Sequence, residues 1–436
     1  MFSTRGRGSH FNKSTHSLGC TIAVCLLALL PYRQVTAQVA TPLTLAEAEE
    51  LALREEPGQS ALQARADSLQ EQAIAAGQLP DPVLRIGIAN YPIESGGFTT
   101  EGMTQGQLGF RQSFPPGKTR SLSTHQFQAL SAEMDWRAIA RARDVLTSVR
   151  TAWLDAYYWE RAHAVVSDSR PYFDDLVTVT RSLYGVGKKN QQDVLRAELE
   201  LSRLDDRLIE IERQRRTASA ALSQWIGPDA IRSIAHQPPA WDRVPAPQTL
   251  RDELARHPAV LASDAKIDAR TAEVQLAEER YKPGWAVDLG YGYRDGFMPD
   301  GSPRSDFVSV SVMVDLPIFR RNRQDRNLGA ALSERRAAQE SREGLLRRLS
   351  SQLEGELARW QELTRRIELY ERRLVVQAAD QARAALAAYR SEAGDFDDVM
   401  RGVVEKLNVQ LDLERLQTEQ RKSYAVLANL GGFPHD

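Results

Sequence analysis

Two short stretches of the chain combine a tyrosine, glycines and carboxylates at similar spacing. The first contains Tyr184, Gly187 and Asp193, and the second runs from Tyr389 through Gly394 into an acidic cluster. The cluster and the residues after it are Asp395, Asp397, Asp398, Val399 and Arg401. Glycines allow a tight reversal between antiparallel helices, and aspartates near a helix start interact favourably with its dipole. We therefore predict two helix-to-helix turns with capping carboxylates, both at one end of a helical assembly where copies of the chain meet.

A phosphate-binding loop is suggested by residues 117–119, Gly-Lys-Thr, which follow a predicted strand and open a predicted helix. The motif also requires a glycine five residues before Gly117, and this chain has Gln112 there. The preceding residues Pro115 and Pro116 lack the backbone N–H groups with which such a loop holds phosphate. We interpret the segment as a strand-to-helix turn and predict no nucleotide site.

Histidines are too scattered to predict a metal centre. No carboxylate pattern accompanies those that follow the first 37 residues. They are His125, His163, His236, His257 and His435. No pairing of a nucleophile with a base stands out either. The sequence therefore predicts a protein that is not an enzyme, with no catalytic residue, no cofactor and no metal site.

The amino terminus has the parts of a secretory signal peptide. A basic stretch precedes the apolar run of residues 21–30, and small residues at 35–37 form a cleavage site. We predict that residues 1–37 are removed together with Cys20 and Cys25, which leaves a mature chain without thiols. Neither cysteine follows the apolar run, so no lipid anchor is expected.

Net charge and hydropathy limit the classes of protein to which the chain can belong. The 436 residues carry a formal net charge of −2, which argues against nucleic acid as a partner. Charged residues interrupt every later apolar stretch, so no transmembrane helix is predicted. Two options remain: a soluble periplasmic or secreted protein, or a β-barrel, whose membrane signal is short and alternating.

The two halves of the chain share a pattern. Residues 51–57 resemble residues 253–258, and at the same shift Pro82 falls on Pro283. Such internal similarity indicates one structural unit used twice, here a helix, two strands and then long helices. The predicted divisions are a first repeat over residues 38–230, a linker over 231–247 and a second repeat over 248–436.

The predicted strands have one apolar, partly aromatic face and one small or polar face. They span about residues 83–91, 107–114, 285–294 and 306–315. Strands of this kind fit either a soluble core or a membrane position with lipid outside and water inside. The helices are too charged to cover them, which favours the membrane. Four strands cannot close a barrel, and an unpaired edge is not tolerated in hydrocarbon, so we expect an oligomer. A trimer would supply twelve strands, although strand count alone also admits a dimer.

Long helices follow the strands. Apolar residues recur at alternating steps of three and four, as in the seam of a coiled coil, over residues 194–225 and 346–374. Single helices are predicted over about 45–79 and 249–281. A helix over about 323–388 would run roughly 100 Å at about 1.5 Å per residue, and its first-half counterpart is expected to break at Pro171. Helices of this length build a tube or stalk.

The repeated plan, the Pro80-Asp81-Pro82 entry to the strands and the two tyrosine–glycine–aspartate turns resemble the TolC-like outer-membrane efflux family. The resemblance covers essentially the whole mature chain. It implies an α+β membrane protein, a homotrimer in which each protomer gives four strands to a 12-stranded transmembrane β-barrel and coiled-coil helices to a periplasmic α-helical tunnel. It also implies outer-membrane lipid around the barrel of a Gram-negative bacterium. The implied partners are a periplasmic adaptor and an inner-membrane efflux pump.

The resemblance also implies roles for the two turns. In the family, the turn after the long second-half helix forms the periplasmic constriction, where an acidic ring holds the entrance closed. Asp398 matches that ring, with Asp395 and Asp397 beside it, and Arg401 stands where the family pattern has a second aspartate. We expect Arg401 to change gating or cation preference. Adaptor contacts are implied for Tyr184, Gly187, Asp193, Tyr389, Gly394 and Val399.

The strand region indicates a branch of the family. Residues 81–84 and 90–92, followed by Met103-Thr104, resemble the outer-membrane partners of heavy-metal (RND) efflux pumps. The implied function is passive conduction of heavy-metal cations delivered by the pump. Multidrug efflux and type I protein secretion are the alternatives within transport. A soluble periplasmic coiled-coil scaffold is the alternative from another class.

Overall fold

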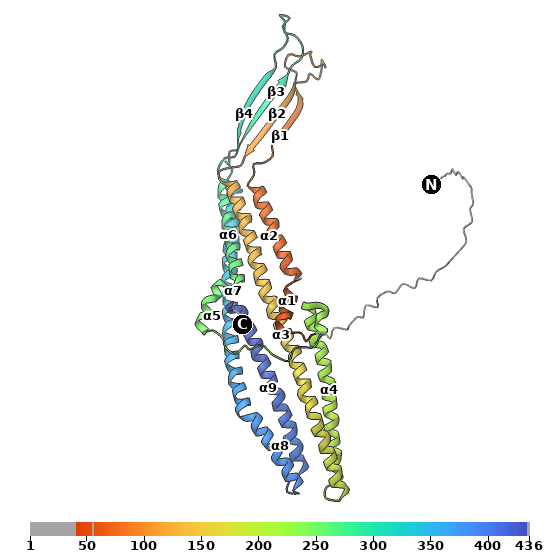
Figure 1. Cartoon of the computed structure of the whole chain (residues 1–436). Coiled ribbons are helices and arrows are strands. Elements are labelled where there is room, and N and C mark those ends of the chain that lie inside the picture. The colour runs from red at the N-terminus through yellow and green to blue at the C-terminus, as the bar shows by residue number, and fades with distance from the viewer. Residues whose placement is uncertain (1–40, 55, 434–436) are drawn as a thin grey trace, which may run out of the picture. The chain divides into compact units, whose positions relative to one another are not determined.

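The computed structural model describes residues 41–54 and 56–433. The predicted signal peptide over 1–37, with both cysteines, lies outside these residues. Residues from Pro42 onward form one compact unit. The labelled helices and strands all belong to this unit (Figure 1).

Both halves of the chain place a strand pair between short helices and long ones. The first half contains α1 (Leu45–Arg54), α2 (Pro57–Ala76), β1 (Val83–Ala89), β2 (Gln105–Phe114), α3 (Thr119–Gly185), α4 (Gln191–Ile226) and the 3₁₀ turn η1 (Gly227–Ile231). The second half contains α5 (Pro247–Glu253), the 3₁₀ turn η2 (Leu254–Arg256), α6 (Pro258–Glu279), β3 (Trp285–Tyr293), β4 (Phe307–Val314), α7 (Gln324–Leu369), the π turn η3 (Tyr370–Leu374), α8 (Val375–Arg390) and α9 (Phe396–Gly431).

The helix predicted at the start of each half is in fact two helices. New helices begin at Pro57 and at Pro258, because proline lacks the N–H that an uninterrupted helix needs and suits a first helical position. The residue before each proline caps the new helix. The Glu56 carboxylate and the His257 imidazole each accept a backbone N–H from the first turn. The predictions of single helices over these segments were therefore wrong.

α3 continues through Pro171, where the sequence predicted a break. A proline inside a helix removes a hydrogen bond and costs about 3 kcal/mol. Here Val166 before the proline and Phe173 after it are both buried in the same apolar cluster. Packing on both sides of the proline offsets its local cost, so the helix runs on to Gly185.

The long second-half helix contains a π turn, η3, which separates α7 from α8. Single π turns insert extra backbone into an α-helix and shift the direction of the side chains that follow. Ile367 of α7 and Ala382 of α8 are nevertheless both buried, and both helices pack against α9. The turn itself contacts α9 through Glu371, which accepts a hydrogen bond from Gln417 at 2.9 Å.

Over the described residues four strands form one antiparallel sheet, in the order β1-β2-β3-β4. Successive side chains along a strand point to opposite faces. One row across the apolar face is Ile86, Leu108, Tyr291 and Val308, and the next row, on the other face, is Arg85, Gly109, Gly290 and Ser309. The apolar row is 44–79% exposed, so no described element covers that face.

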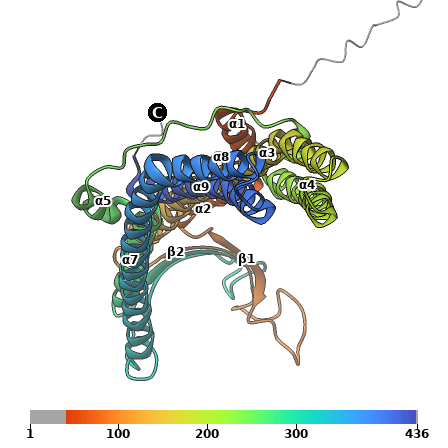
Figure 2. The same ribbon diagram turned by 90° about the horizontal axis from the view of Figure 1, so that it is seen from below.

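The helices that join the sheet form a row in the same order as the strands. α2 packs against α3, α3 against α6, and α6 against α7. Each is joined to one strand, since α2 precedes β1, α3 follows β2, α6 precedes β3 and α7 follows β4. The row and the sheet therefore end in matching edges, α2 with β1 and α7 with β4. Figure 2 shows the strands following a curve, with α7 at one margin.

Apolar clusters hold the remaining helices together. One cluster centres on Trp153 of α3 and joins α1, α4 and η1; the Trp153 indole also donates a hydrogen bond to the carbonyl of Leu43 at 3.1 Å. A second cluster, around Phe173 and Tyr389, joins α3 and α4 to α8 and α9. None of the helices in the described ranges is long and apolar enough to cross a membrane.

Candidate functional site at the hairpin tips

The two predicted turns end the α3–α4 and α8–α9 hairpins, which reach the same end of the unit (Figure 1). Gly187 adopts a left-handed backbone with φ of 74°, and Glu392 does so in the other turn with φ of 64°. Lys188 forms an ion pair with Glu392 at 2.9 Å, and the Lys189 ammonium donates to the carbonyl of Gly394 at 3.4 Å. These contacts join turns that lie about two hundred residues apart in the chain.

Tyr389 links the hairpins from within. Its side chain is 1% exposed, and its hydroxyl donates to the Asp193 carboxylate at 3.1 Å. Phe396 packs against its ring with centroids 5.4 Å apart, and the Lys189 ammonium lies 4.4 Å from the ring centre. Burial raises the pKa of the Tyr389 phenol, and the Asp193 carboxylate raises it further. The phenol is therefore a hydrogen-bond donor at any physiological pH.

The aspartates of the acidic cluster differ in their contacts. Asp397 forms an ion pair with Arg196 of the other hairpin, whereas Asp398 pairs with Arg401 of its own helix at 3.6 Å. The side chains of Asp398 and Arg401 are 61% and 72% exposed. Asp395 stands at the N-cap of α9 without a side-chain capping bond in the described structure. Of these three aspartates, only Asp397 forms an ion pair with the other hairpin among the described residues, so the three have different roles.

The tips are neutral overall. Residues 184–196 and 389–401 together contain five basic and five acidic side chains. A neutral tip attracts cations less strongly than an uncompensated ring of carboxylates would. Arg401 contributes to this balance directly, because it lies beside the aspartate that the sequence analysis placed at the constriction.

The residues predicted to contact an adaptor differ in accessibility. Tyr184 is 48% exposed and Gly187 also lies at the surface, whereas Val399 is fully buried against α8 and α9 neighbours. Gly394 allows close approach, since a Cβ there would lie 3.0 Å from the Cβ of Ala388. Of these four residues, Tyr184 and Gly187 are exposed, whereas Val399 lies in the packed interior of the hairpins.

Sequence reasoning missed the basic half of this site. Lys188, Lys189 and Arg196 are ordinary turn and helix residues until the fold brings the second hairpin beside them. The adjacent lysines in a glycine turn were the available signal. Nothing in the local sequence identifies Glu392 or Asp397 as their partners.

The glycine–lysine turn at residues 117–119 does not hold an anionic ligand. The Lys118 N–H donates to the Glu279 carboxylate at 2.9 Å, so a side chain of α6 occupies the position. A Cβ on Gly117 would lie 1.8 Å from that carboxylate. The hydrogen bond from Lys282 lowers the pKa of Glu279, and the Lys118 N–H adds to this effect. The turn therefore connects β2 to α3 and is held by the Glu279 carboxylate.

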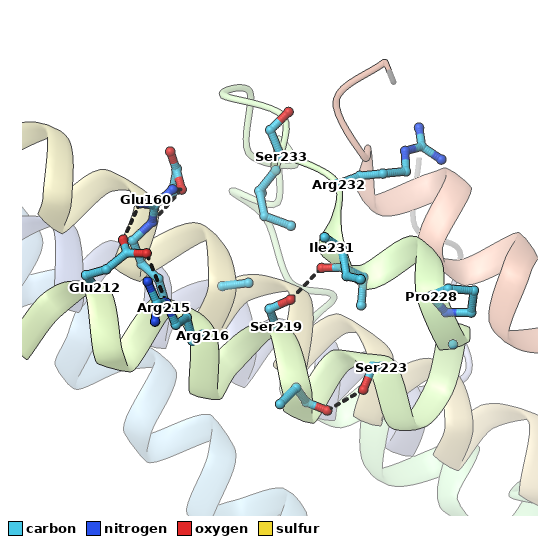
Figure 3. Close-up of a pocket in the computed structure, with 15 residues that line it drawn as sticks. Glu160, Glu212, Arg215, Arg216, Ser219, Ser223, Pro228, Ile231, Arg232 and Ser233 are labelled. Atoms are coloured by element: carbon cyan, nitrogen blue, oxygen red, sulfur yellow. Dashed lines mark hydrogen bonds and ion pairs between the residues drawn. The ribbon is translucent and has the colours of Figure 1, made fainter. Parts of the chain in front are cut away.

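In two other polar regions, the charged side chains pair with one another. A concavity of about 750 Å³ lies beside the end of α4 (Figure 3). In it Arg215 pairs with Glu160 at 2.6 Å and with Glu212 at 2.7 Å. These internal pairs indicate a structural groove rather than a ligand site.

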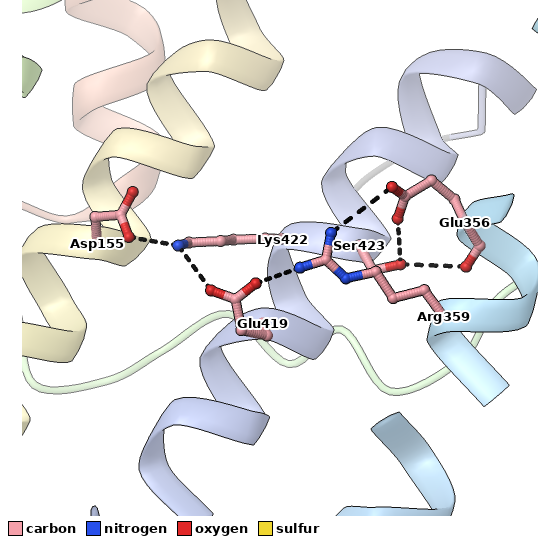
Figure 4. Close-up of polar contacts among 6 residues, drawn as sticks. All are labelled: Asp155, Glu356, Arg359, Glu419, Lys422 and Ser423. Carbon is pink, nitrogen blue, oxygen red and sulfur yellow. Dashed lines mark hydrogen bonds and ion pairs between the residues drawn. The ribbon is translucent and has the colours of Figure 1, made fainter. Parts of the chain in front are cut away.

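A chain of charges links three of the long helices (Figure 4). Lys422 of α9 pairs with Asp155 of α3 and, at 3.0 Å, with Glu419. Glu419 in turn pairs with Arg359 of α7. Among the residues that the structure describes, no three metal-ligating side chains gather into a candidate metal site.

Comparison with known proteins gives partial sequence matches. Residues 249–432 match the family described as outer membrane efflux protein. Protein CyaE of Bordetella pertussis is 31% identical over 206 residues, which are 44% of this chain and 42% of CyaE. The cobalt-zinc-cadmium resistance protein CzcC of Cupriavidus metallidurans is 30% identical over 157 residues, 35% of each chain. The matched stretches thus span less than half of either relative.

The fold matches over nearly the whole chain. The outer membrane protein VceC of Vibrio cholerae superposes with a TM-score of 0.75 at 19% identity, covering 90% of this chain and 97% of VceC. Other solved outer-membrane channels share the fold at similar scores. The prediction of a TolC-like fold is confirmed. Residues 249–432 thus match the outer membrane efflux protein family, and over nearly its whole length the chain has the fold of the TolC-like channels.

Proposed function

We propose that this chain is one protomer of an outer-membrane channel that works in an efflux system. Three copies would form a passive path to the cell exterior, loaded by an inner-membrane pump through a periplasmic adaptor. The family match over residues 249–432 and the fold support this assignment. The chain carries no motif for an energy source, so transport would be driven by the pump.

The observation that carries the proposal is a sheet whose apolar face and two edges are uncovered in the described chain. Its apolar face is exposed along all four strands, with Ile86 at 76% and Val308 at 79%. Exposed apolar area of this extent is typical of surfaces that meet lipid or another chain. Free edges at β1 and β4 would pair between copies, because an open edge cannot persist in hydrocarbon. Three copies would then close a twelve-stranded sheet with lipid outside.

The hairpin tips would form the gate at the other end. Contacts from Tyr389 to Asp193 and from Arg196 to Asp397 hold the two hairpins of one copy together. Asp398 and Arg401 remain exposed beside them, and we place them at the constriction where three copies converge. Opening would require the α8–α9 hairpin to move away from the α3–α4 hairpin and so break the contacts between them.

The substrate class that we favour is a heavy-metal cation. The partial match to CzcC, a cobalt-zinc-cadmium resistance protein, supports it. A channel need not hold a ligand cluster for its cargo, since selection belongs to the pump. The adaptor would dock on the exposed turn residues around Tyr184 and Gly187.

Growth of a deletion strain across metal salts, dyes, detergents and antibiotics tests the proposal. Restored growth on cobalt, zinc or cadmium salts by the plasmid-borne gene, with no change for drugs, would establish metal efflux. Sensitivity to dyes and antibiotics alone would assign multidrug efflux instead. A protein recovered in the soluble periplasmic fraction without detergent would overturn the channel and favour a coiled-coil scaffold.

A substitution at Asp398 tests the gate. Removing its charge leaves Arg401 without its partner and makes each copy more positive at the constriction. We expect Asp398→Ala to lower cation permeability and weaken block by divalent cations in planar bilayers. Asp380→Ala on the exposed side of α8 is the matched control. Unchanged conductance, selectivity and block in Asp398→Ala would show that the gate lies elsewhere.

A further inference from the structure

The polar face of the sheet concentrates its charge in one place. The strand sequences contain two arginines and one aspartate and no other ionised side chain. Arg111 of β2 donates its Nε–H to the Asp288 carboxylate of β3 at 2.9 Å. Arg85 of β1 approaches the other carboxylate oxygen at 3.5 Å. Two guanidinium groups therefore share one carboxylate across three neighbouring strands.

The cluster presents its positive charge outward. The Asp288 side chain is 13% exposed, whereas those of Arg85 and Arg111 are 58% and 40% exposed. Two positive groups against one negative leave one positive charge in each copy. The carboxylate is covered and the guanidinium groups face solvent, so an ion that approaches this face meets arginine.

Glycines make room for this arrangement. The Arg85 side chain lies across Gly109, with its Nε and Nη2 atoms 3.3 Å from the point where a Cβ would stand. A Cβ there would press on the Arg85 side chain, which would have to shift by a few tenths of an ångström. Gly290 follows Gly109 in the same row, and Gly292 lies in the next row of that face. The Ser309 hydroxyl and the Gln105 amide oxygen occupy the space over Gly290 and Gly292, so these glycines let neighbouring side chains lie close against the polar face.

We propose that Arg85, Arg111 and Asp288 form an anion-attracting ring in the lumen of the channel. This inference rests on the proposed function, because only closure of the sheet by several copies turns the polar face inward and repeats the cluster around an axis. Rings of charged side chains set ion selectivity in pores, and arginine rings favour anions such as chloride or phosphate. Because the hairpin tips are neutral overall, the ring carries the larger net charge of these two regions.

Reversal potentials in planar bilayers under a potassium chloride gradient test the ring. We expect Arg85→Gln and Arg111→Gln each to raise the potassium-to-chloride permeability ratio about two- to fivefold at low salt, and Asp288→Asn to lower it. The effect should shrink in about 1 M salt, where screening acts over about 3 Å. Gln107→Asn, an uncharged change on the same face, should leave the ratio unchanged.

Charge-conserving variants separate selectivity from folding. Arg85→Lys and Arg111→Lys keep the charge and should keep the wild-type permeability ratio, even where they weaken the contact with Asp288. A conducting pore whose ratio is the same in wild type and both glutamine variants would overturn the ring while leaving the channel in place. Purified wild-type protein that forms no conducting pore would instead overturn the proposed function.

Discussion

At the residue scale, Tyr389 is the most constrained member of the hairpin-tip site. Its ring is buried while its hydroxyl holds Asp193 of the opposite hairpin. The raised pKa of the phenol keeps the donor proton in place at neutral and mildly alkaline pH. The contact between hairpins therefore does not depend on pH in the physiological range, and its loss requires movement of the helices.

Tyr389→Phe should weaken the contact between the hairpins while keeping the packing of the core. The substitution keeps the ring against Phe396 and removes one hydrogen bond, at a cost of about 0.5–1.5 kcal/mol. We expect more frequent opening or higher single-channel conductance in planar bilayers. Tyr184→Phe, at an exposed tyrosine of the other hairpin, is the control. Wild-type openings in Tyr389→Phe would show that the Asp193 contact does not limit opening.

His257 gives the fold a pH dependence of its own. Burial lowers the pKa of this imidazole, and the Arg143 guanidinium lowers it further, against smaller opposing effects of Asn429 and Asp144. The folded pKa lies below the unfolded value of 6.5, so the unfolded chain binds a proton more readily. The contribution to stability is complete above about pH 6.5 and is lost as pH falls through the folded pKa.

His257→Asn should flatten this part of the stability profile. Asparagine still accepts a helix N-terminal N–H, as His257 does from Ala259. We expect a smaller drop in melting temperature between about pH 7.5 and pH 5 than in wild type, followed by circular dichroism. His125→Asn, at a half-exposed histidine, is the control. An unchanged slope in His257→Asn would assign the acid sensitivity to other groups.

At the element scale, α8 and α9 approach each other through a glycine. A Cβ on Gly402 would lie 3.1 Å from the Cα of Ala382. Gly402→Leu should therefore push the helices apart and destabilise the hairpin by about 1–3 kcal/mol, the usual cost of overpacking. Faster proteolysis near the hairpin tips would report it. Gly344→Leu in α7, where nothing lies within 4 Å, should not destabilise the protein.

Element type could be predicted from the sequence where local pattern decides it. Alternation in β3 and β4 and the heptad seam of α4 depend on near neighbours, so all three elements form where expected. Helix interruptions depend on packing as well. A new helix begins at Pro57, whereas Pro171 lies inside α3, where buried neighbours on both sides stabilise the helix. The π turn at η3 has no local signal in the sequence, and it contacts α9 through Glu371.

In the candidate site, too, some features follow from local sequence and others depend on packing. Asp398, Arg401 and Tyr389 stand in turns whose glycines and aspartates are visible in the sequence. Asp398 and Arg401 pair with each other within one turn of α9, at a spacing that the sequence shows. The partners of Tyr389 and Asp397 are not visible, because Asp193 and Arg196 lie in a hairpin from the other half of the chain. Long-range ion pairs of this kind follow from the topology and cannot be derived from spacing.

At the scale of the whole molecule, the matching order of strands and helices decides how copies can meet. The edge formed by β1 and α2 differs from the edge formed by β4 and α7. An interface between unlike edges is head-to-tail, and such interfaces close into rings when the rotation allows it. The apolar faces of neighbouring copies must also coincide, because a slip of one residue would turn every side chain to the other face.

Cysteine pairs at the two edges test this arrangement. The predicted mature chain has no cysteine, so Ile86→Cys of β1 can be combined in turn with Val308→Cys, Val310→Cys or Val312→Cys of β4. All four positions lie on the apolar face. We expect oxidation in the membrane to cross-link one of the three combinations and to give a ladder of bands that stops at three chains. Ile86→Cys alone should give no ladder. A ladder that stops at two chains would replace the trimer by a dimer, and no cross-link in any combination would show that β1 and β4 do not meet between copies.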